Sequence, residues 1–249
     1  MFIRCDFMNE FLVVILLALL PIMGSIIGGI APEFFKISQR NLSLALHATT
    51  GIILAVISVE LIPRSLEAGN PLIIILAFIA GGFFYIIIDQ FINWSRPFGN
   101  SNKSTGVWAI FMGIILDLFT DGIMIGTSSL ISLQLGFLLA LGQISANIPG
   151  NFSVIAKFKE EGVDRRTRIL LNTSSVLPVL IGATAGYWLV KGEPQIVKFV
   201  LLSFTAGILL TVTVEEIIPE SHKGEEARLA ALAFIGGFAL FALISSFVT

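Results

Sequence analysis

Residues 49–65 read TTGIILAVISVELIPRS, and residues 205–221 read TAGILLTVTVEEIIPES. Each segment has a glycine, a glutamate nine positions later and a proline three positions after that, so the two match at a constant offset of 156 residues. The same offset aligns LAFI at residues 76–79 with LAFI at residues 232–235. The chain therefore contains an internal repeat whose copies are almost entirely apolar.

The repeat extends toward the N-terminal side of each copy. At an offset of 157, two Leu-Pro pairs and two glycines match, namely Leu20-Pro21 and Gly29 with Leu177-Pro178 and Gly186. Apolar helices can resemble one another by chance. The offset, the order of the motifs and the placement of proline and glycine agree. This agreement favours a true repeat, with one copy at about residues 11–92 and the other at about residues 168–248.

Composition predicts that these segments lie in a membrane. Of the 249 residues, 55% are hydrophobic and only 13% are charged, against about 25% charged in a typical soluble domain. A helix needs about 20 mostly apolar residues to span a bilayer, and helices satisfy their own backbone there. We expect an all-α polytopic protein with eight spans, at residues 11–31, 42–62, 71–92, 106–126, 133–156, 169–190, 197–218 and 229–248.

Three spans fall in each copy of the repeat, and two lie between the copies. Because three is odd, the second copy must be inverted in the membrane relative to the first. We therefore expect one transmembrane transporter domain over residues 1–249, in a 3+2+3 arrangement with the central helices at about residues 106–156. Inverted repeats are typical of transporters whose substrate site lies near the bilayer midplane.

The distribution of Lys and Arg predicts the orientation. The loops after the first, third, fifth and seventh spans share a side and carry eleven of the fifteen Lys and Arg residues. This bias predicts that both termini are extracytoplasmic, and the short loops suit the cytoplasmic membrane of a prokaryotic cell. The net charge of −2 gives no indication of nucleic-acid binding. We expect no cofactor, and the bilayer is the expected surrounding partner.

The central spans contain polar residues that are costly in a membrane. Asp117 and Asp121 are one helical turn apart and therefore share a face. A carboxylate at this depth needs a partner, a cation or a water-filled cavity. Gln143, Asn147 and Asn151 form a similar stripe on the next span. Amides in membrane helices often only bond a neighbouring helix, but four oxygen-bearing side chains at one depth suit a divalent cation.

Other polar residues are more ambiguous. Glu60 and Glu216 are the carboxylates related by the repeat, and they could form an entry and an exit for cations. The alternative is that both simply face water near a helix end. We interpret Asp89 and His47 as interfacial groups, and His222 as part of a solvated charged loop.

Two motifs in the central spans resemble those of the ZIP metal transporters. Residues 117–122, DLFTDG, occupy the place of that family's His-Asn-x-x-Asp-Gly. Residues 143–152, QISANIPGNF, fit its His-Glu-x-Pro-His-Glu-x-Gly-Asp-Phe without gaps. Gly122, Gly150, Phe152 and the acid at Asp121 match outright. The resemblance implies that a divalent metal ion is the substrate.

The resemblance also implies a ligand set, and the chain departs from it. The family's first metal site maps onto Asp117, Asp121, Gln143 and Asn147, all of which offer oxygen. Its second site would need ligands at Leu118 and Ile144, which cannot bind a metal. We infer a single site. Because oxygen ligands suit manganese, magnesium and calcium better than zinc, we expect selectivity either to shift toward a harder cation such as Mn²⁺ or to be relaxed among divalent ions, with zinc as the family's default.

The leading hypothesis is a divalent metal transporter that works by alternating access. A degenerate protein that binds metal as a sensor or partner remains an alternative, because the second site is lost. An intramembrane hydrolase with Asp117 and Asp121 as an acid pair is disfavoured, since the spans lack the histidines of a metal-dependent hydrolase. The glycine pairs at residues 81–82 and 236–237 allow close helix packing, either within the chain or in a homodimer.

Overall fold

The computed structural model describes residues 2–36, 38–67, 70–94, 103–222 and 227–248, with side chains from residue 10 onward except at residues 92–94, 103–110 and 227. All regular structure in these ranges is helical. The elements are α1 (Phe2–Phe34), α2 (Gln39–Ala55), η1 (Val56–Leu61), α3 (Ile62–Glu67), α4 (Pro71–Trp94), α5 (Lys103–Ser129), α6 (Leu133–Glu160), α7 (Arg165–Ser174), α8 (Val176–Val190), α9 (Gln195–Val212), η2 (Thr213–Ile217), α10 (Ile218–Ser221) and α11 (Ala227–Val248), where η marks a π-helical turn.

Seven segments among these residues are long and apolar enough to cross a membrane. They are Glu10–Phe34, Gln39–Glu67, Pro71–Phe91, Phe111–Ser129, Arg165–Val190, Gln195–Ser221 and Arg228–Val248. The chain is therefore a polytopic membrane protein. The remaining expected span, residues 133–156, lies within the 28 residues of α6, whose polar Gln143, Asn147 and Asn151 reduce its hydropathy.

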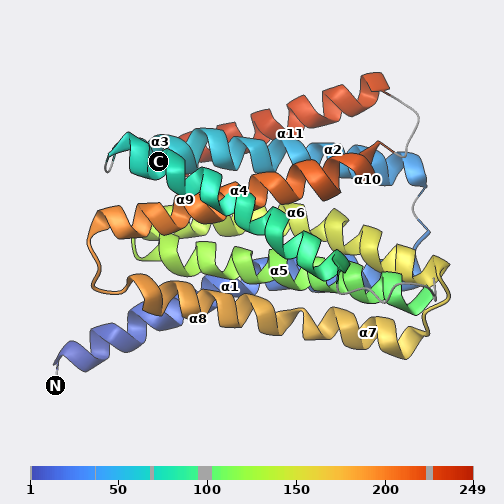
Figure 1. Cartoon of the computed structure of the whole chain (residues 1–249), viewed down its shortest axis with the longest axis horizontal. Helices are drawn as coiled ribbons and strands as arrows, with labels where there is room; N and C mark the ends of the chain where they lie inside the picture. The colour runs from blue at the N-terminus through green and yellow to red at the C-terminus, as the bar shows by residue number, and fades with distance from the viewer. Residues whose placement is uncertain (1, 37, 68–69, 95–102, 223–226, 249) are drawn as a thin grey trace.

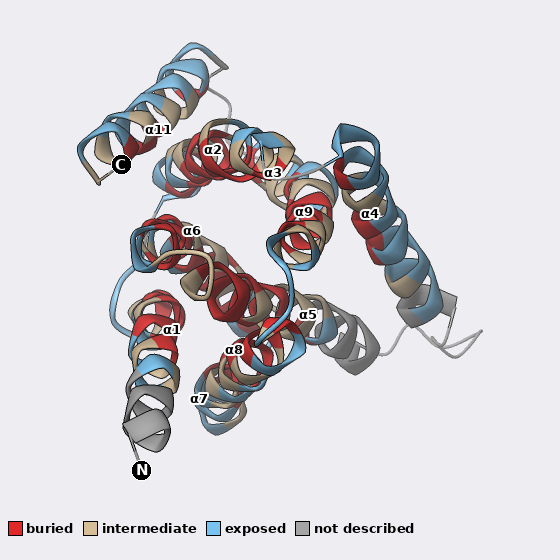
Figure 2. Cartoon of the chain, turned by 90° about the vertical axis from the view of Figure 1, so that its left-hand side faces the viewer, coloured by how far each residue is buried: buried red, intermediate tan, exposed pale blue. Residues whose placement is uncertain are grey.

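The outer surface of the bundle is apolar. Helices α4 and α11 lie at the periphery and are exposed along most of their length (Figure 2). Their exposed side chains include Phe83 and Ile87 on α4, and Leu240 and Phe247 on α11. A soluble monomer rarely exposes such a large apolar area, whereas lipid tails cover it at no cost. The faces with polar side chains turn inward instead.

The helices pack in four extensive pairs: α1 with α6, α5 with α8, α2 with α11, and α4 with α9 (Figure 1). The first two pairs each join one central helix to the first helix of a repeat copy. The other two each join the second helix of one copy to the third helix of the other copy. In addition, η1 interrupts the second span at the position where η2 interrupts the seventh. The sequence repeat therefore has a counterpart in packing and in local helix geometry.

Glycines permit these close helix pairs. A Cβ atom would overlap a carbonyl oxygen of the facing helix at four repeat-related positions: Gly51 against Phe234, Gly207 against Phe78, Gly81 against Phe204, and Gly237 against Ala48. Backbones in this arrangement approach without intervening side chains, as is common in membrane helix pairs. Gly81, Gly82 and Gly237 thus serve contacts within the chain, whereas a Cβ at Gly236 would meet nothing within 4 Å.

Adjacent glycines on α11 provide a matched test of this packing. A Cβ added at Gly237 would overlap the Ala48 carbonyl, whereas one at Gly236 meets nothing within 4 Å. Gly237→Ala is expected to destabilise the protein by about 1–3 kcal/mol through overpacking, seen as a lower thermal midpoint in detergent. Gly236→Ala should leave that midpoint unchanged. Equal effects of the two substitutions would show that α11 does not pack on α2 in this register.

Candidate metal centre

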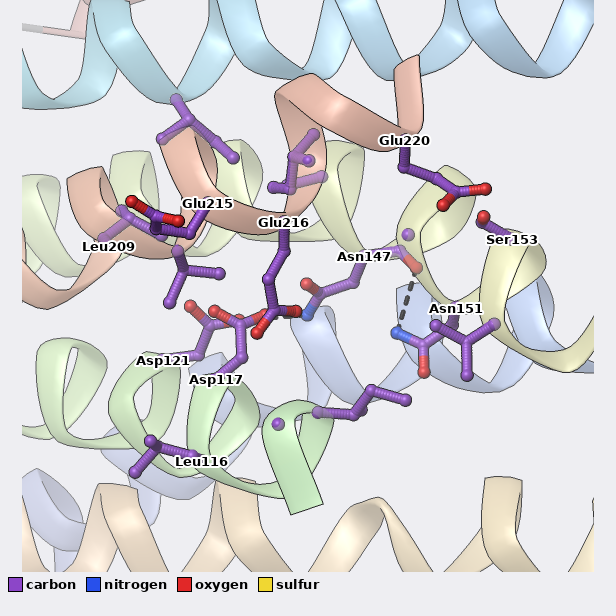
Figure 3. Close-up of a pocket in the computed structure, with 18 of the residues that line it drawn as sticks. Leu116, Asp117, Asp121, Asn147, Asn151, Ser153, Leu209, Glu215, Glu216 and Glu220 are labelled. Carbon is purple, nitrogen blue, oxygen red and sulfur yellow. Dashed lines mark hydrogen bonds between the residues drawn. The ribbon is translucent and has the colours of Figure 1, made fainter. Parts of the chain in front are cut away.

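A cavity of about 420 Å³ lies between the central helices and the second helix of the C-terminal repeat copy (Figure 3). Its lining includes Asp117 and Asp121 from α5, Gln143, Asn147 and Asn151 from α6, and Glu216 from η2. All six of these residues are candidates predicted from the sequence. They come from three helices, so the tertiary fold brings them to one space.

The two central helices are joined by hydrogen bonds at Asp121. Its carboxylate accepts a bond of 3.1 Å from the Asn147 side-chain amide, and its backbone carbonyl accepts one of 3.3 Å from the Gln143 amide. These contacts turn the NH₂ group of Gln143 toward α5. The Gln143 Oε1 atom is buried and has no hydrogen-bond partner. A buried acceptor without a partner is costly, and a cation would satisfy it.

Asp117 and Glu216 complete the acidic part of the cavity. Figure 3 shows the carboxylates of Asp117, Asp121 and Glu216 pointing into the same space. Gly113, one turn before Asp117, makes room for Glu216, because a Cβ there would lie 3.2 Å from Glu216 Oε1. Tyr85, a buried residue of α4, donates a hydrogen bond to Glu216.

Several polar lining residues are not among the candidates selected from the sequence, including Tyr85, Asp89 and Lys157. Asp89 was interpreted as an interfacial group, but it lines the cavity. Tyr85 and Asp89 are one turn apart on α4, and this i,i+4 pairing of polar groups within an apolar span was the available signal. Lys157 was counted only for orientation, since a lysine near a helix end usually faces water.

Glu60 has a different environment from Glu216. It is only 2% exposed, so it does not face water, and it is absent from the cavity lining. Its carboxylate pairs with Arg64 at 2.7 Å and accepts a hydrogen bond from Ser245 of α11. The two glutamates related by the sequence repeat therefore differ, one neutralised by an arginine and the other open to the cavity.

The positions of a second metal site lie outside the cavity. Leu118 is fully buried against α1 and α8, and neither Leu118 nor Ile144 is among the lining residues. Within the described part of the chain, no three His, Cys, Asp or Glu side chains converge closely enough to enclose a metal ion. A cation in the cavity would therefore rely on amide oxygens and water as well as carboxylates, which hard cations accept.

The cavity is closed at one end. A large apolar cluster of α2, η1, α6 and α9, including Leu61, Leu135 and Leu202, packs beyond the cavity residues Val56 and Met124. In the other direction the lining continues to Lys157 near the end of α6 and to Glu220 of α10. The polar interior thus extends toward one end of the bundle only.

These features define a polytopic helical membrane protein with an acidic polar cavity between its central helices. A model of the ZIP zinc transporter family matches residues 99–245, so the chain belongs to the ZIP family. Zinc transporters ZupT from Shigella dysenteriae and from Escherichia coli are each 27% identical over 198 residues, covering 74% of this chain and 76% of theirs. Membership makes the chain a transporter rather than an enzyme.

Proposed function

We propose that the protein carries divalent metal ions across the membrane through a single site formed by Asp117, Asp121, Gln143 and Asn147. The observation that carries the proposal is the cavity, where two carboxylates from α5 face two amides from α6. Two carboxylates neutralise one divalent cation, and the amide oxygens complete part of its shell without adding charge. The unpartnered Gln143 Oε1 gives such an ion a ready ligand.

Zinc is the expected cargo by relationship, since the matched relatives are named zinc transporters. The chemistry of the midplane site points toward harder ions. All four ligand positions offer oxygen, which suits Mn²⁺ better than the imidazole sites that zinc prefers. We propose that the midplane site accepts Mn²⁺ at least as well as Zn²⁺.

Alternating access is the proposed mechanism. Each helix pair is equivalent to another pair by the sequence repeat: α2–α11 corresponds to α4–α9, and α1–α6 corresponds to α5–α8. This correspondence supports eight spans, including α6, in an inverted 3+2+3 arrangement over residues 1–249. The repeat copies are about residues 11–92 and 168–248, and the central helices about 106–156. A cavity open toward one end and sealed at the other supports one of two alternating states. Inverted repeats rock around a fixed site in such transporters.

The open end of the cavity is proposed to face the cytoplasm. The ends of α1 and α11 lie at the same end of the bundle (Figure 1), which fits an even number of spans. Lys157 and Lys159 lie at the opposite end, on the side richer in Lys and Arg, and the positive-inside bias makes that side cytoplasmic. Arg96 and Lys223, which contribute to the bias, lie outside the described residues. Both termini are then extracytoplasmic.

Glu216 and Asn151 are proposed to continue the path from the midplane to the cytoplasm. Both line the open part of the cavity, with Glu216 held by Tyr85. Glu60 is proposed to act at the sealed end, where its ion pair with Arg64 balances the charge of its carboxylate. Opening that end would separate the pair and expose a carboxylate to entering cations.

Metal binding to the purified protein tests the midplane site. Mn²⁺ is expected to bind with a stoichiometry of one per chain, measured by isothermal titration or electron paramagnetic resonance. The double variant Asp117→Asn/Asp121→Asn should lose this binding, because all four proposed ligand positions then carry neutral amides. Competition of Mn²⁺ with Zn²⁺, Fe²⁺, Cd²⁺, Mg²⁺ and Ca²⁺ then ranks these ions by their affinity for the site and shows whether it prefers hard cations. Mn²⁺ binding that survives in the double variant would overturn the assignment.

A metal-binding sensor without transport is the second candidate. The loss of ligands at Leu118 and Ile144 favours it, because one of the family's two sites is missing. Uptake into proteoliposomes separates the candidates. Mn²⁺ binding together with ion entry supports transport, and binding with no ion entry supports the sensor.

A further inference from the structure

The two histidines of the chain meet although 175 residues separate them. His47 lies near the start of α2, and His222 follows α10. Their ring centres are 5.1 Å apart with the planes inclined at 61°. The contact is fixed by neighbouring bonds, since the Ser43 hydroxyl on α2 donates to the Ser221 carbonyl. Judged one at a time, each histidine looked like an ordinary polar group.

Both rings have the protonation pattern of metal ligands. His47 Nδ1 lies 2.8 Å from the Ser43 carbonyl oxygen, and His222 Nδ1 lies 2.8 Å from the Ile218 carbonyl oxygen. Because a carbonyl can only accept, both Nδ1 atoms carry the proton. Each Nε2 atom is then left with its lone pair. Histidines that bind metals usually donate their other N–H to a carbonyl or carboxylate in this way.

The lone pair of His47 is not strongly engaged. Its nearest polar neighbour is the Ser221 hydroxyl, at 3.4 Å from Nε2. That hydroxyl donates instead to the Ile218 carbonyl at 2.7 Å, so its single hydrogen is used. The ring spacing also fits a shared ion. With metal–nitrogen distances of about 2.1 Å and a tetrahedral angle, two imidazole centres on one zinc lie about 5 Å apart.

We propose that His47 and His222 form a second metal site, which binds zinc or another imidazole-preferring transition ion through the two Nε2 atoms. The site lies beside the cavity: neither histidine is among its lining residues, but Leu46 and Glu220, close to the pair in the chain, are. Water fills the remaining coordination positions, so the ion is held loosely enough to leave. If the proposed transport is correct, the pair supplies the nitrogen ligands that the all-oxygen midplane site lacks.

Histidine NMR tests this site directly, because His47 and His222 are the only histidines and each signal can be assigned. We would titrate Zn²⁺ into detergent-solubilised protein with ¹³C-labelled histidine, in the Asp117→Asn/Asp121→Asn background. Both Cε1–H signals are expected to shift together and to saturate at one equivalent. Mg²⁺ should leave both signals in place, since it does not prefer imidazole.

The variant His222→Gln removes one ligand at an exposed position and should fold normally. Its His47 signal is expected to need at least about tenfold more Zn²⁺ to shift. With Asp117 and Asp121 intact, His222→Gln should still bind Mn²⁺ at the midplane at one per chain. Independent shifts of the two signals, or a normal His47 response in His222→Gln, would overturn the proposal. Mn²⁺ binding measures the midplane site, and the histidine NMR signals measure the second site. The failure of one proposal is therefore distinguishable from the failure of the other.

Discussion

Metal uptake is expected to fall on the order of a hundredfold or more when Asp117 and Asp121 are both replaced by Asn. Asp117 and Asp121 are the two carboxylates of the proposed ligand set, and Glu216 in the same cavity is already engaged by a hydrogen bond from Tyr85. Removing one partner of a buried charge pair typically costs about 3–5 kcal/mol, and the double variant removes both carboxylates of the proposed ligand set. The measurement is the initial rate of Mn²⁺ and Zn²⁺ entry into proteoliposomes.

Asparagine is the suitable replacement because it keeps the shape of aspartate. In particular, the bond from the Asn147 amide to position 121 can persist through the new side-chain oxygen. The matched control is Glu215→Gln, which removes a carboxylate that also lines the cavity but is exposed. This control should keep most of the uptake. Unchanged uptake in the double variant would mean that the ion passes elsewhere, and the four polar residues would then be contacts between helices.

The helical segments could be predicted closely from the sequence. Seven of the eight expected spans fall inside a helix or a helix continued by a π-turn, such as residues 42–62 within Gln39–Glu67. The eighth, residues 169–190, is divided between α7 and α8 by a turn at Ser175. Lipid leaves the backbone few alternatives to the helix, so apolar length alone locates a span. The residues of the candidate site could also be proposed from the sequence, because a carboxylate in a membrane span is costly and therefore usually has a functional role.

Contacts between distant helices could not be predicted in the same way. The motif around Glu60 matches that around Glu216, but one glutamate is buried against Arg64 and the other opens to the cavity. The difference depends on which neighbours close around each helix in this state. Tyr85 and the pair of histidines were missed for a similar reason, because single polar groups gain a function only through partners from other helices.

Breaking the ion pair between Arg168 and Glu33 is expected to destabilise the protein by about 3 kcal/mol or more. Arg168 is 7% exposed, and its guanidinium donates to both carboxylate oxygens of Glu33 at 2.7 and 2.9 Å. This bidentate contact ties the end of α1 to α7 and is the stronger form of ion pair. Arg168→Leu would leave the Glu33 carboxylate buried with weaker partners. Unfolding in detergent, followed by circular dichroism, measures the loss.

Arg165 provides the exposed comparison for the same carboxylate. It lies 3.4 Å from Glu33, but its side chain is 63% exposed, and an ion pair in water contributes about 1 kcal/mol or less. Arg165→Leu should therefore change the free energy of unfolding only slightly. Equal losses from Arg165→Leu and Arg168→Leu would show that burial does not decide the strength of this contact.

The double variant Glu33→Leu/Arg168→Leu separates two contributions to the free energy of unfolding: the cost of leaving the Glu33 charge without its main partner, and the stabilisation that the ion pair itself provides. Most of the loss in Arg168→Leu comes from Glu33, which loses its main partner while it stays in a buried position. Replacing both residues with leucine removes the charge as well, and such exchanges are often neutral or stabilising. The double variant is thus expected to recover much of the stability that Arg168→Leu loses. If it is instead less stable than Arg168→Leu, the pair itself holds α1 against α7, and its geometry matters more than its charge balance.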